Sequence, residues 1–385
     1  MKTMGASDRM IWFDANRTLA AFGVVLIHCT TDFAGQPFAA VTADQRIVPE
    51  LFRSIADVSG AEMFFVFSLF LLAFKLDRRD LDFVQTMKYQ AQRLLVPFFF
   101  WTLFYPFFRL AKASAFGYAP SMLDELRQWP SWSEYFLLGT AQYHLHFLPT
   151  LFALVLFYPV MQVATRYPVT GLAVFGLLGA MDYVQGYLWG AIGDPVLRDY
   201  LLRVTKILGY VGYGFAAFAI YGFWKPGLPR GEARLLGRSA FFLAVFAFVA
   251  TLPYAAQAVA TGAWPVRQGW DFYAHFLMPL FVFVAFMGAQ YASWSPTWSR
   301  LARFTLGIYL VHPIFVDIYD IVVFKSGLMP APSIMVITKY VLVAPAALGL
   351  AFLLSRTSLL AWTIGLGPVP WRGRGRGAAP LTVRV

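Results

Sequence analysis

The chain has 385 residues, a formal net charge of +11 and one cysteine; 59% of its residues are hydrophobic and only 13% are charged. Soluble domains usually carry about a quarter charged residues, so this composition excludes an ordinary soluble globular protein and indicates an integral membrane protein. The one cysteine, Cys29, excludes an internal disulfide and a multi-cysteine metal site.

Apolar segments long enough to cross a bilayer recur along the chain. A hydrocarbon core of about 30 Å needs roughly 20 apolar residues per helix. We predict ten such segments, near residues 11–30, 54–74, 94–113, 145–165, 168–188, 203–224, 239–261, 271–292, 303–323 and 335–355. The fold is therefore expected to be all-α, with about ten transmembrane helices around a polar interior.

Basic residues in the loops set the predicted orientation. Loops on the side of the N-terminus carry more Lys and Arg than the opposite loops, in a count that assigns Lys112 and Lys339 to the outer side. The positive-inside rule then places both termini in the cytoplasm. The net charge is favourable beside anionic membrane lipid and requires no nucleic-acid partner. We assign residues 1–365 to one transmembrane domain and 366–385 to a basic cytoplasmic tail that is expected to be disordered.

The first segment, WFDANRTLAAFGVVLIHC, carries Arg17 and His28 eleven residues apart. Three helical turns place both side chains on one face, with roughly 16 Å between them. Such a polar stripe on a membrane helix indicates a polar interior. Asp14, three residues before Arg17, is positioned to pair with it. A salt bridge that anchors the cytoplasmic end is the alternative for Arg17, and a structural role is the alternative for His28.

Glu62 begins the second apolar segment, GAEMFFVFSLFLLAF. The predicted topology places it at the depth of His28, where a carboxylate can fix the tautomer of a catalytic imidazole and stabilise its protonated form. The alternative is an acid that complements the helix dipole at the N-terminus. Ser68, further along this segment, is expected to pack between helices rather than to act as a nucleophile.

Three later segments add polar residues. Arg93 begins the third and is an interfacial anchor unless a phosphate-bearing ligand docks there. In YHLHFLPTLF, His144 and His146 point in different directions on a helix, which disfavours a metal site; His144 either contacts a polar acceptor or anchors the interface. In TLGIYLVHPIF, Pro313 leaves a carbonyl one turn back without its donor, and we expect His312 mainly to satisfy that carbonyl.

Four of these stretches, in chain order, resemble the acyltransferase-3 family of bacterial membrane enzymes that acylate glycans. FDANRTLAAFGVVLIHC resembles its opening helix, whose hallmark is Arg, ten residues, His. GAEMFFVFSLFLL is similar to G-V-D-V-F-F-V-L-S-G-F-L, with Glu62 at the acid and Leu69 in place of the second Gly. YHLHFLPTL is similar to Y-H-L-W-F-L, with His146 in place of Trp, and TLGIYLVH matches the closing Y-L-x-H. The third helix departs, because the family's R-x-x-R reads Gln90 and Arg93 here.

The resemblance implies an O-acyltransferase of the bacterial inner membrane that needs no cofactor or metal. Acyl-CoA, with acetyl-CoA as the expected donor, would supply the acyl group from the cytoplasm. The acceptor would be a carbohydrate hydroxyl of a cell-surface or periplasmic polysaccharide or its lipid-linked precursor. Arg17 and Arg93 would bind the donor, and His28 would act as general base oriented by Glu62; an acyl-His28 intermediate is an alternative course. The residues expected either at the acceptor site or in structural roles are Asp14, Ser68, His144 and His312.

Two other functions fit the same sequence. A polytopic transporter or exporter of a glycan or small solute matches the composition equally well. Consumption of a thioester with release of free CoA separates an acyltransferase from such a transporter. A succinyltransferase acting on periplasmic glucans would keep the same fold and change only the acyl group.

Overall fold

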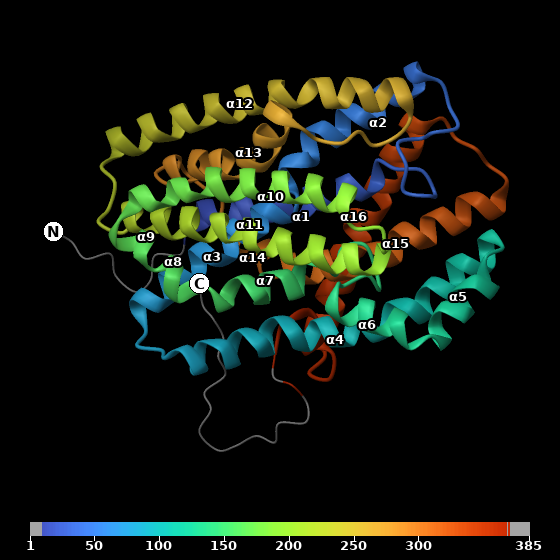
Figure 1. The fold of residues 1–385 in the computed structure, drawn as a ribbon, viewed down its shortest axis with the longest axis horizontal. Coiled ribbons are helices and arrows are strands. Elements are labelled where there is room, and N and C mark those ends of the chain that lie inside the picture. The colour runs from blue at the N-terminus through green and yellow to red at the C-terminus, as the bar shows by residue number, and fades with distance from the viewer. Residues whose placement is uncertain (1–9, 368, 370–385) are drawn as a thin grey trace.

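A computed structural model describes residues 10–367 and 369. In that part of the chain every regular element is helical, and the long helices lie side by side along one direction (Figure 1). The helices on the predicted segments are α1 (Ile11–Cys29), α3 (Ala61–Arg78), α4 (Phe83–Phe116), α7 (Phe147–Leu156), α8 (Tyr158–Met161), α9 (Val163–Arg166), α10 (Ala173–Ala191), α11 (Pro195–Trp224), α12 (Arg230–Thr261), α13 (Gly269–Gly288), α15 (Thr305–Ser326) and α16 (Pro332–Arg356). The remaining elements are α2 (Ala43–Ala56), α5 (Ala119–Arg127), α6 (Trp129–Leu137), α14 (Thr297–Ala302) and three 3₁₀ turns, η1 (Asp57–Ser59), η2 (Pro168–Leu172) and η3 (Ala361–Ile364).

Each predicted apolar segment falls on a helix, which confirms an all-helical membrane protein. By length and composition, eight helical stretches of the described chain can cross a membrane, and a bent pair, α7 with α8–α9, makes a ninth if it forms one span. Helix α1 is not among them, because polar side chains lower its hydropathy. A count of about ten spans and cytoplasmic termini remain predictions. The predicted tail at 366–385 lies almost entirely outside the described residues.

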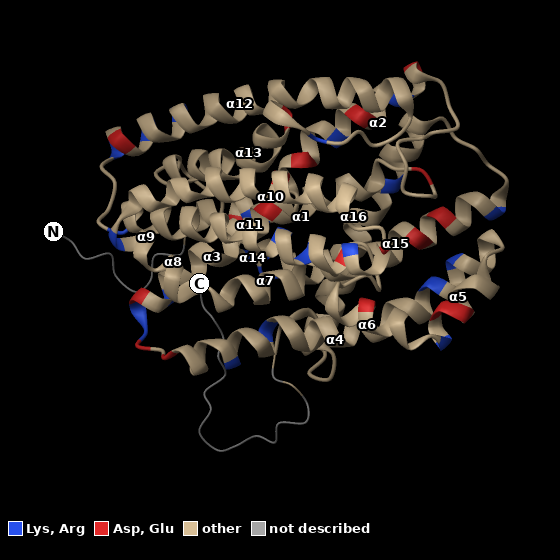
Figure 2. Ribbon diagram, viewed as in Figure 1, with Lys and Arg blue, Asp and Glu red and all other residues tan. Residues whose placement is uncertain are grey.

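Two ends of the bundle are named here after residues of α1. Helices α1, α4 and α12 run from the Arg17 end to the His28 end. Helices α3 and α13 run in the opposite direction. Figure 2 shows basic residues at the Arg17 end, both on α12 and around the turn between α3 and α4.

Helix α1 is central to the packing and contacts α3, α13, α14, α15 and α16. Near its start, Trp12 and Phe13 make ring contacts with Phe70 and Phe283, and all four side chains are buried. Near its end, a Cβ added at Gly23 would lie 2.1 Å from Ser59 Oγ. Only glycine permits this close approach of α1 to η1. Because α3 begins directly after η1, the approach fixes where the first turn of α3 lies along α1.

Helix α2 is an amphipathic element that the apolar segments did not predict. Its buried Arg46 donates from Nε to the carbonyl oxygen of Phe38 and from Nη1 to that of Val259, both at 3.0 Å. Arg53, at the end of the helix, donates to the carbonyl oxygen of Ile27 at 3.2 Å. These bonds attach α2 to α12 and to the last turn of α1, beside His28.

Candidate active site

Helix α1 carries the predicted polar stripe without a break over its 19 residues. Arg17 and His28 are therefore about three turns apart, roughly 16 Å, on the same face. Both are partly exposed, whereas Ala21 and Val24, which lie between them on that face, are buried. The stripe thus has two polar ends separated by an apolar middle.

Arg17 is bound by α14 and by its own helix. Its Nη2 donates to the carbonyl oxygen of Ala302 at 2.9 Å and to Asp14 Oδ1 at 3.3 Å. The second carboxylate oxygen of Asp14 accepts a hydrogen bond from Ser299 Oγ at 2.7 Å. The predicted pairing of Asp14 with Arg17 is present. Because Asp14 is fourteen residues, or roughly 21 Å, from His28 along the helix, it belongs to the Arg17 end.

Four basic residues from α1, from the end of α3 and from α4 lie near one another at the Arg17 end. The guanidinium groups of Arg93, Arg79 and Arg17 lie close enough to the side-chain amine of Lys75 to repel its positive charge. The aliphatic arm of Lys75 places its Nζ 5.2 Å from the ring centre of Tyr89. The structure therefore brings Arg17 and Arg93 into one cationic region, and such a region attracts a polyanionic ligand. We call these four residues the basic cluster.

His28 lies among aromatic rings that come from two other segments, the turn before α7 and helix α15. Its ring centre is 4.2 Å from that of Tyr143 and 5.2 Å from that of His312, on which it stacks at 23°. The ring of His144 is 5.2 Å from that of His312 and 5.1 Å from that of Tyr309. Three imidazoles from separate segments thus meet at the His28 end. In the described part of the chain, no group of three or more His, Cys, Asp or Glu could hold a metal ion.

His312 satisfies a backbone carbonyl with one nitrogen and leaves the other unused. Its Nδ1 is 2.7 Å from the carbonyl oxygen of Tyr309. Pro313 has no N–H, so this carbonyl four residues before it lacks its helical donor, and the predicted bond from His312 to it is present. Because a carbonyl only accepts, Nδ1 carries the proton and Nε2 of the neutral ring is an acceptor. Nε2 is buried and has no hydrogen-bond partner among the described residues.

His144 lies in the turn before α7, outside the spanning helices. Burial, and then the nearby His312 and His28, lower the pKa of His144 well below its usual range, so its ring is neutral near pH 7. The hydroxyl of Tyr309 donates to the backbone carbonyl of His144 and fixes this turn on α15. His144 therefore presents a fixed, uncharged surface close to His28.

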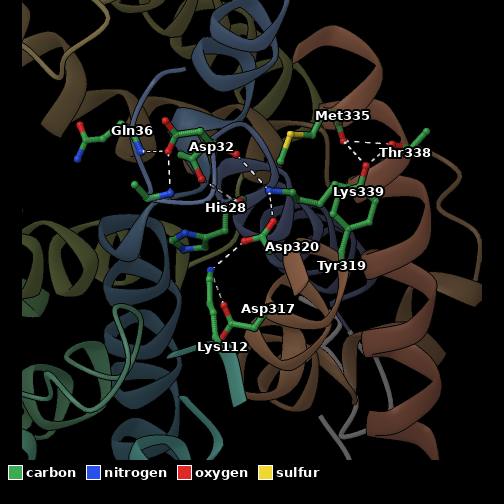
Figure 3. Close-up of polar contacts among 12 residues, drawn as sticks. His28, Asp32, Gln36, Lys112, Asp317, Tyr319, Asp320, Met335, Thr338 and Lys339 are labelled. Carbon is green, nitrogen blue, oxygen red and sulfur yellow. Dashed lines mark hydrogen bonds and ion pairs between the residues drawn. The ribbon is translucent and has the colours of Figure 1, made fainter. Parts of the chain in front are cut away.

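A buried network of four charges lies beside His28 (Figure 3). Lys112 of α4 donates to Asp317 Oδ1 at 2.8 Å and to Asp320 Oδ2 at 2.9 Å, both on α15. On the other side of Asp320, Lys339 of α16 lies 2.8 Å from Oδ1. Two lysines balance two carboxylates, so the network is neutral while it joins three helices around the end of α1. We call these four residues the ion network.

Glu62 is bound to a different partner from the one that the sequence suggested. Its Oε1 accepts a hydrogen bond from the hydroxyl of Tyr210 on α11 at 3.0 Å. No hydrogen bond or ion pair that the described residues make joins Glu62 to His28. The reason is that α3 packs along α11, toward which the carboxylate turns. Ser68, on the same helix, makes no side-chain hydrogen bond within the described residues and is partly exposed.

Comparison with known families gives the class of this protein. A family model described as an acyltransferase domain matches residues 10–356, which is most of the chain. The chain belongs to the acyltransferase-3 family. It is therefore a membrane acyltransferase, and the match gives no support to a transporter. Comparisons with curated proteins and with solved structures found no match.

The ion network of this acyltransferase was misassigned from the sequence. The charge count from sequence assigns Lys112 and Lys339 to outer loops, but they lie within α4 and α16. The available signal was the pair Asp317 and Asp320 inside the ninth apolar segment, because buried carboxylates in a membrane protein require cationic partners. Sequence could reveal the need for partners but not which lysines supply them.

The basic cluster of this acyltransferase also contains residues that the sequence analysis did not select. Gln90, which stands at the first position of the family's R-x-x-R, is buried and adds no charge to this cluster. Lys75 and Arg79 lie near Arg93 and supply positive charge there. They were treated as ordinary cytoplasmic loop charges, because their proximity to Arg17 depends on how α3 turns into α4.

Proposed function

We propose that this acyltransferase moves an acetyl group from cytoplasmic acetyl-CoA to a hydroxyl of a cell-surface or periplasmic polysaccharide or its lipid-linked precursor, in the inner membrane of a bacterium. Family membership supports acyl transfer in general. The observation that carries the rest is the geometry of α1, whose one face links the basic cluster to the imidazoles around His28. A donor with several phosphates and an acceptor with only hydroxyls require two such different ends.

The donor binds at the basic cluster in this proposal. CoA carries phosphates, and an arginine guanidinium binds a phosphate through a forked pair of donors. Arg93 and Arg79 would hold phosphates together with Lys75, while Arg17 stands at the start of the stripe that leads to His28. The slender arm of the donor would span the roughly 16 Å between Arg17 and His28, so that its thioester reaches the imidazole.

His28 is the proposed general base. As the acceptor oxygen attacks the thioester carbonyl, the imidazole takes the hydroxyl proton; the new C–O bond forms and the C–S bond breaks. The protonated imidazole then returns a proton to the leaving thiolate, which gives free CoA. A positioned base of this kind typically contributes about 10²–10⁴-fold to the rate. The buried Nε2 of His312 is suited to accept a hydrogen bond from the same acceptor.

The acceptor approaches from the His28 end in this proposal. Tyr143 packs on His28 yet is 41% exposed, so its ring forms a boundary between the site and the surroundings. An exposed aromatic face beside neutral imidazoles suits an uncharged carbohydrate. Glu62 contributes through its bond to Tyr210, which holds α3 against α11, rather than by direct contact with His28.

The test uses purified protein in lipid nanodiscs with acetyl-CoA and a candidate glycan. We expect the wild type to release free CoA and to add acetyl to the glycan, as measured by mass spectrometry. His28→Ala should lower the rate about 10²–10⁴-fold while its thermal unfolding temperature stays near that of the wild type. Full activity of His28→Ala would overturn the assignment of the base, and a succinylated glycan from cells that carry the gene would overturn the assignment of acetyl.

A further inference from the structure

A groove runs between α12 and α13 at the Arg17 end, away from the candidate active site. This open groove has a volume of about 340 Å³, which is within the range of small-molecule sites. Its lining is apolar except for two arginines. The lining residues on which the inference depends are Arg234, Arg238, Phe241, Ala285, Phe286 and Trp294.

Glycine contacts and a fixed tryptophan create this groove. A Cβ added at Gly288 would lie 2.3 Å from Gly237 Cα, so the backbones of α12 and α13 touch there. The larger side chains on either side then stand apart and leave a depression. Trp294 donates from its indole to the carbonyl oxygen of Ala289 at 2.9 Å and stacks on Phe286 at 22°. These contacts hold the tryptophan wall in place.

The two arginines of the groove are available for a ligand. Arg234 and Arg238 are four residues apart on α12, so they project from one face of the helix. Both are exposed, and neither forms an ion pair with another described residue. On the same helix, Phe241 and Phe242 are 57% and 69% exposed. The groove therefore joins a cationic mouth to an apolar surface of the kind that faces lipid tails.

We infer that this groove binds one anionic phospholipid of the bilayer. Its phosphate would lie between Arg234 and Arg238, whose forked donors match phosphate oxygens. One acyl chain would lie against Phe241 and Phe286. A zwitterionic lipid also has a phosphate, but it brings a cationic group next to the two arginines, so the site selects a lipid with net negative charge. This inference does not depend on the reaction proposed for His28.

Competition between two lipids tests the inference on the full chain. The protein is purified in detergent, stripped of lipid and offered phosphatidylglycerol and phosphatidylcholine with identical acyl chains. Native mass spectrometry then measures the affinity for the first bound lipid. We expect a preference for phosphatidylglycerol, and Arg234→Ala/Arg238→Ala should weaken its binding about thirtyfold, since each basic residue near an anionic headgroup contributes about fivefold.

Two further variants make the result specific. Ala285→Trp fills the groove, so it should reduce the binding of both lipids. Arg166→Ala/Arg356→Ala removes two exposed arginines outside the groove and should leave phosphatidylglycerol binding unchanged. Equal affinity of the wild type for the two lipids would overturn the inference. An equal loss of binding in both double-arginine variants would overturn it as well, because general surface charge would then explain the preference.

Discussion

Replacing Lys339 by methionine tests whether the ion network stabilises the packing at the His28 end. Lys339 is fully buried, lies 2.8 Å from Asp320 Oδ1 and donates to the carbonyl oxygen of Thr31 at 3.1 Å. Methionine keeps much of the side-chain length but removes the charge and the donors. Among the described residues Asp320 then keeps only Lys112 as a cationic partner, and Lys112 is already shared with Asp317.

The expected magnitude follows from the charge balance of the network. The wild-type network is neutral, and Lys339→Met leaves one buried negative charge without compensation. Removal of one partner of a buried ion pair typically costs about 3–5 kcal/mol of unfolding free energy. Lys339→Met/Asp320→Asn restores neutrality and keeps the Lys112–Asp317 pair. The double variant should therefore be less destabilised than the single variant, with a coupling energy of up to about 3 kcal/mol.

The single cysteine provides a local readout for this experiment. Cys29 is buried at the end of α1, and the charges of Lys339 and Asp320 act on it. A thiol-reactive fluorophore should therefore label Cys29 on heating when this end of the bundle opens. Lys325→Met, on the exposed last turn of α15, is the matched control and should leave the transition unchanged. Labelling of Cys29 in Lys339→Met at the same temperature as in the wild type would refute the reasoning. Equal losses of unfolding free energy in the single and double variants would refute it as well.

Two predictions concern the other proposed site residues. Arg93→Ala should raise the KM for acetyl-CoA about 10–100-fold, the usual loss for a hydrogen bond to a charged group, with little effect on the KM for the glycan. The control is Arg78→Ala, because the guanidinium of Arg78 lies 4.1 Å from the ring centre of Phe74. Equal effects of both variants on the KM for acetyl-CoA would contradict the donor site. Glu62→Gln should lower kcat less than tenfold, because an amide oxygen still accepts the hydrogen bond from Tyr210; a loss as large as that of His28→Ala would instead show that the carboxylate charge acts on the base.

The sequence predicted what one helix determines by itself. The spacing of Arg17 and His28 follows from helical geometry alone, and so does the pairing of Asp14 with Arg17. The bond from His312 to the carbonyl freed by Pro313 is equally local. In contrast, the prediction that Glu62 lies near His28 rests on their similar depth in the membrane. Depth does not determine how a helix is rotated about its own axis. That rotation, set by packing, turns the carboxylate toward α11.

The contacts of Arg17 connect donor binding to the opening of the stripe. Between Arg17 and His28 the stripe is formed by Ala21 and Val24, which are 0% and 5% exposed, so packed side chains occupy the path that the donor arm must take. Arg17 also donates to the carbonyl oxygen of Ala302, which joins α1 to α14. In the proposed reaction a donor phosphate competes with that carbonyl for the same guanidinium. Loss of the bond to Ala302 would leave the hydrogen bond from Ser299 to Asp14 between α14 and α1. Phosphate binding would therefore loosen, but not break, the attachment of α14 at the start of the stripe that leads to His28.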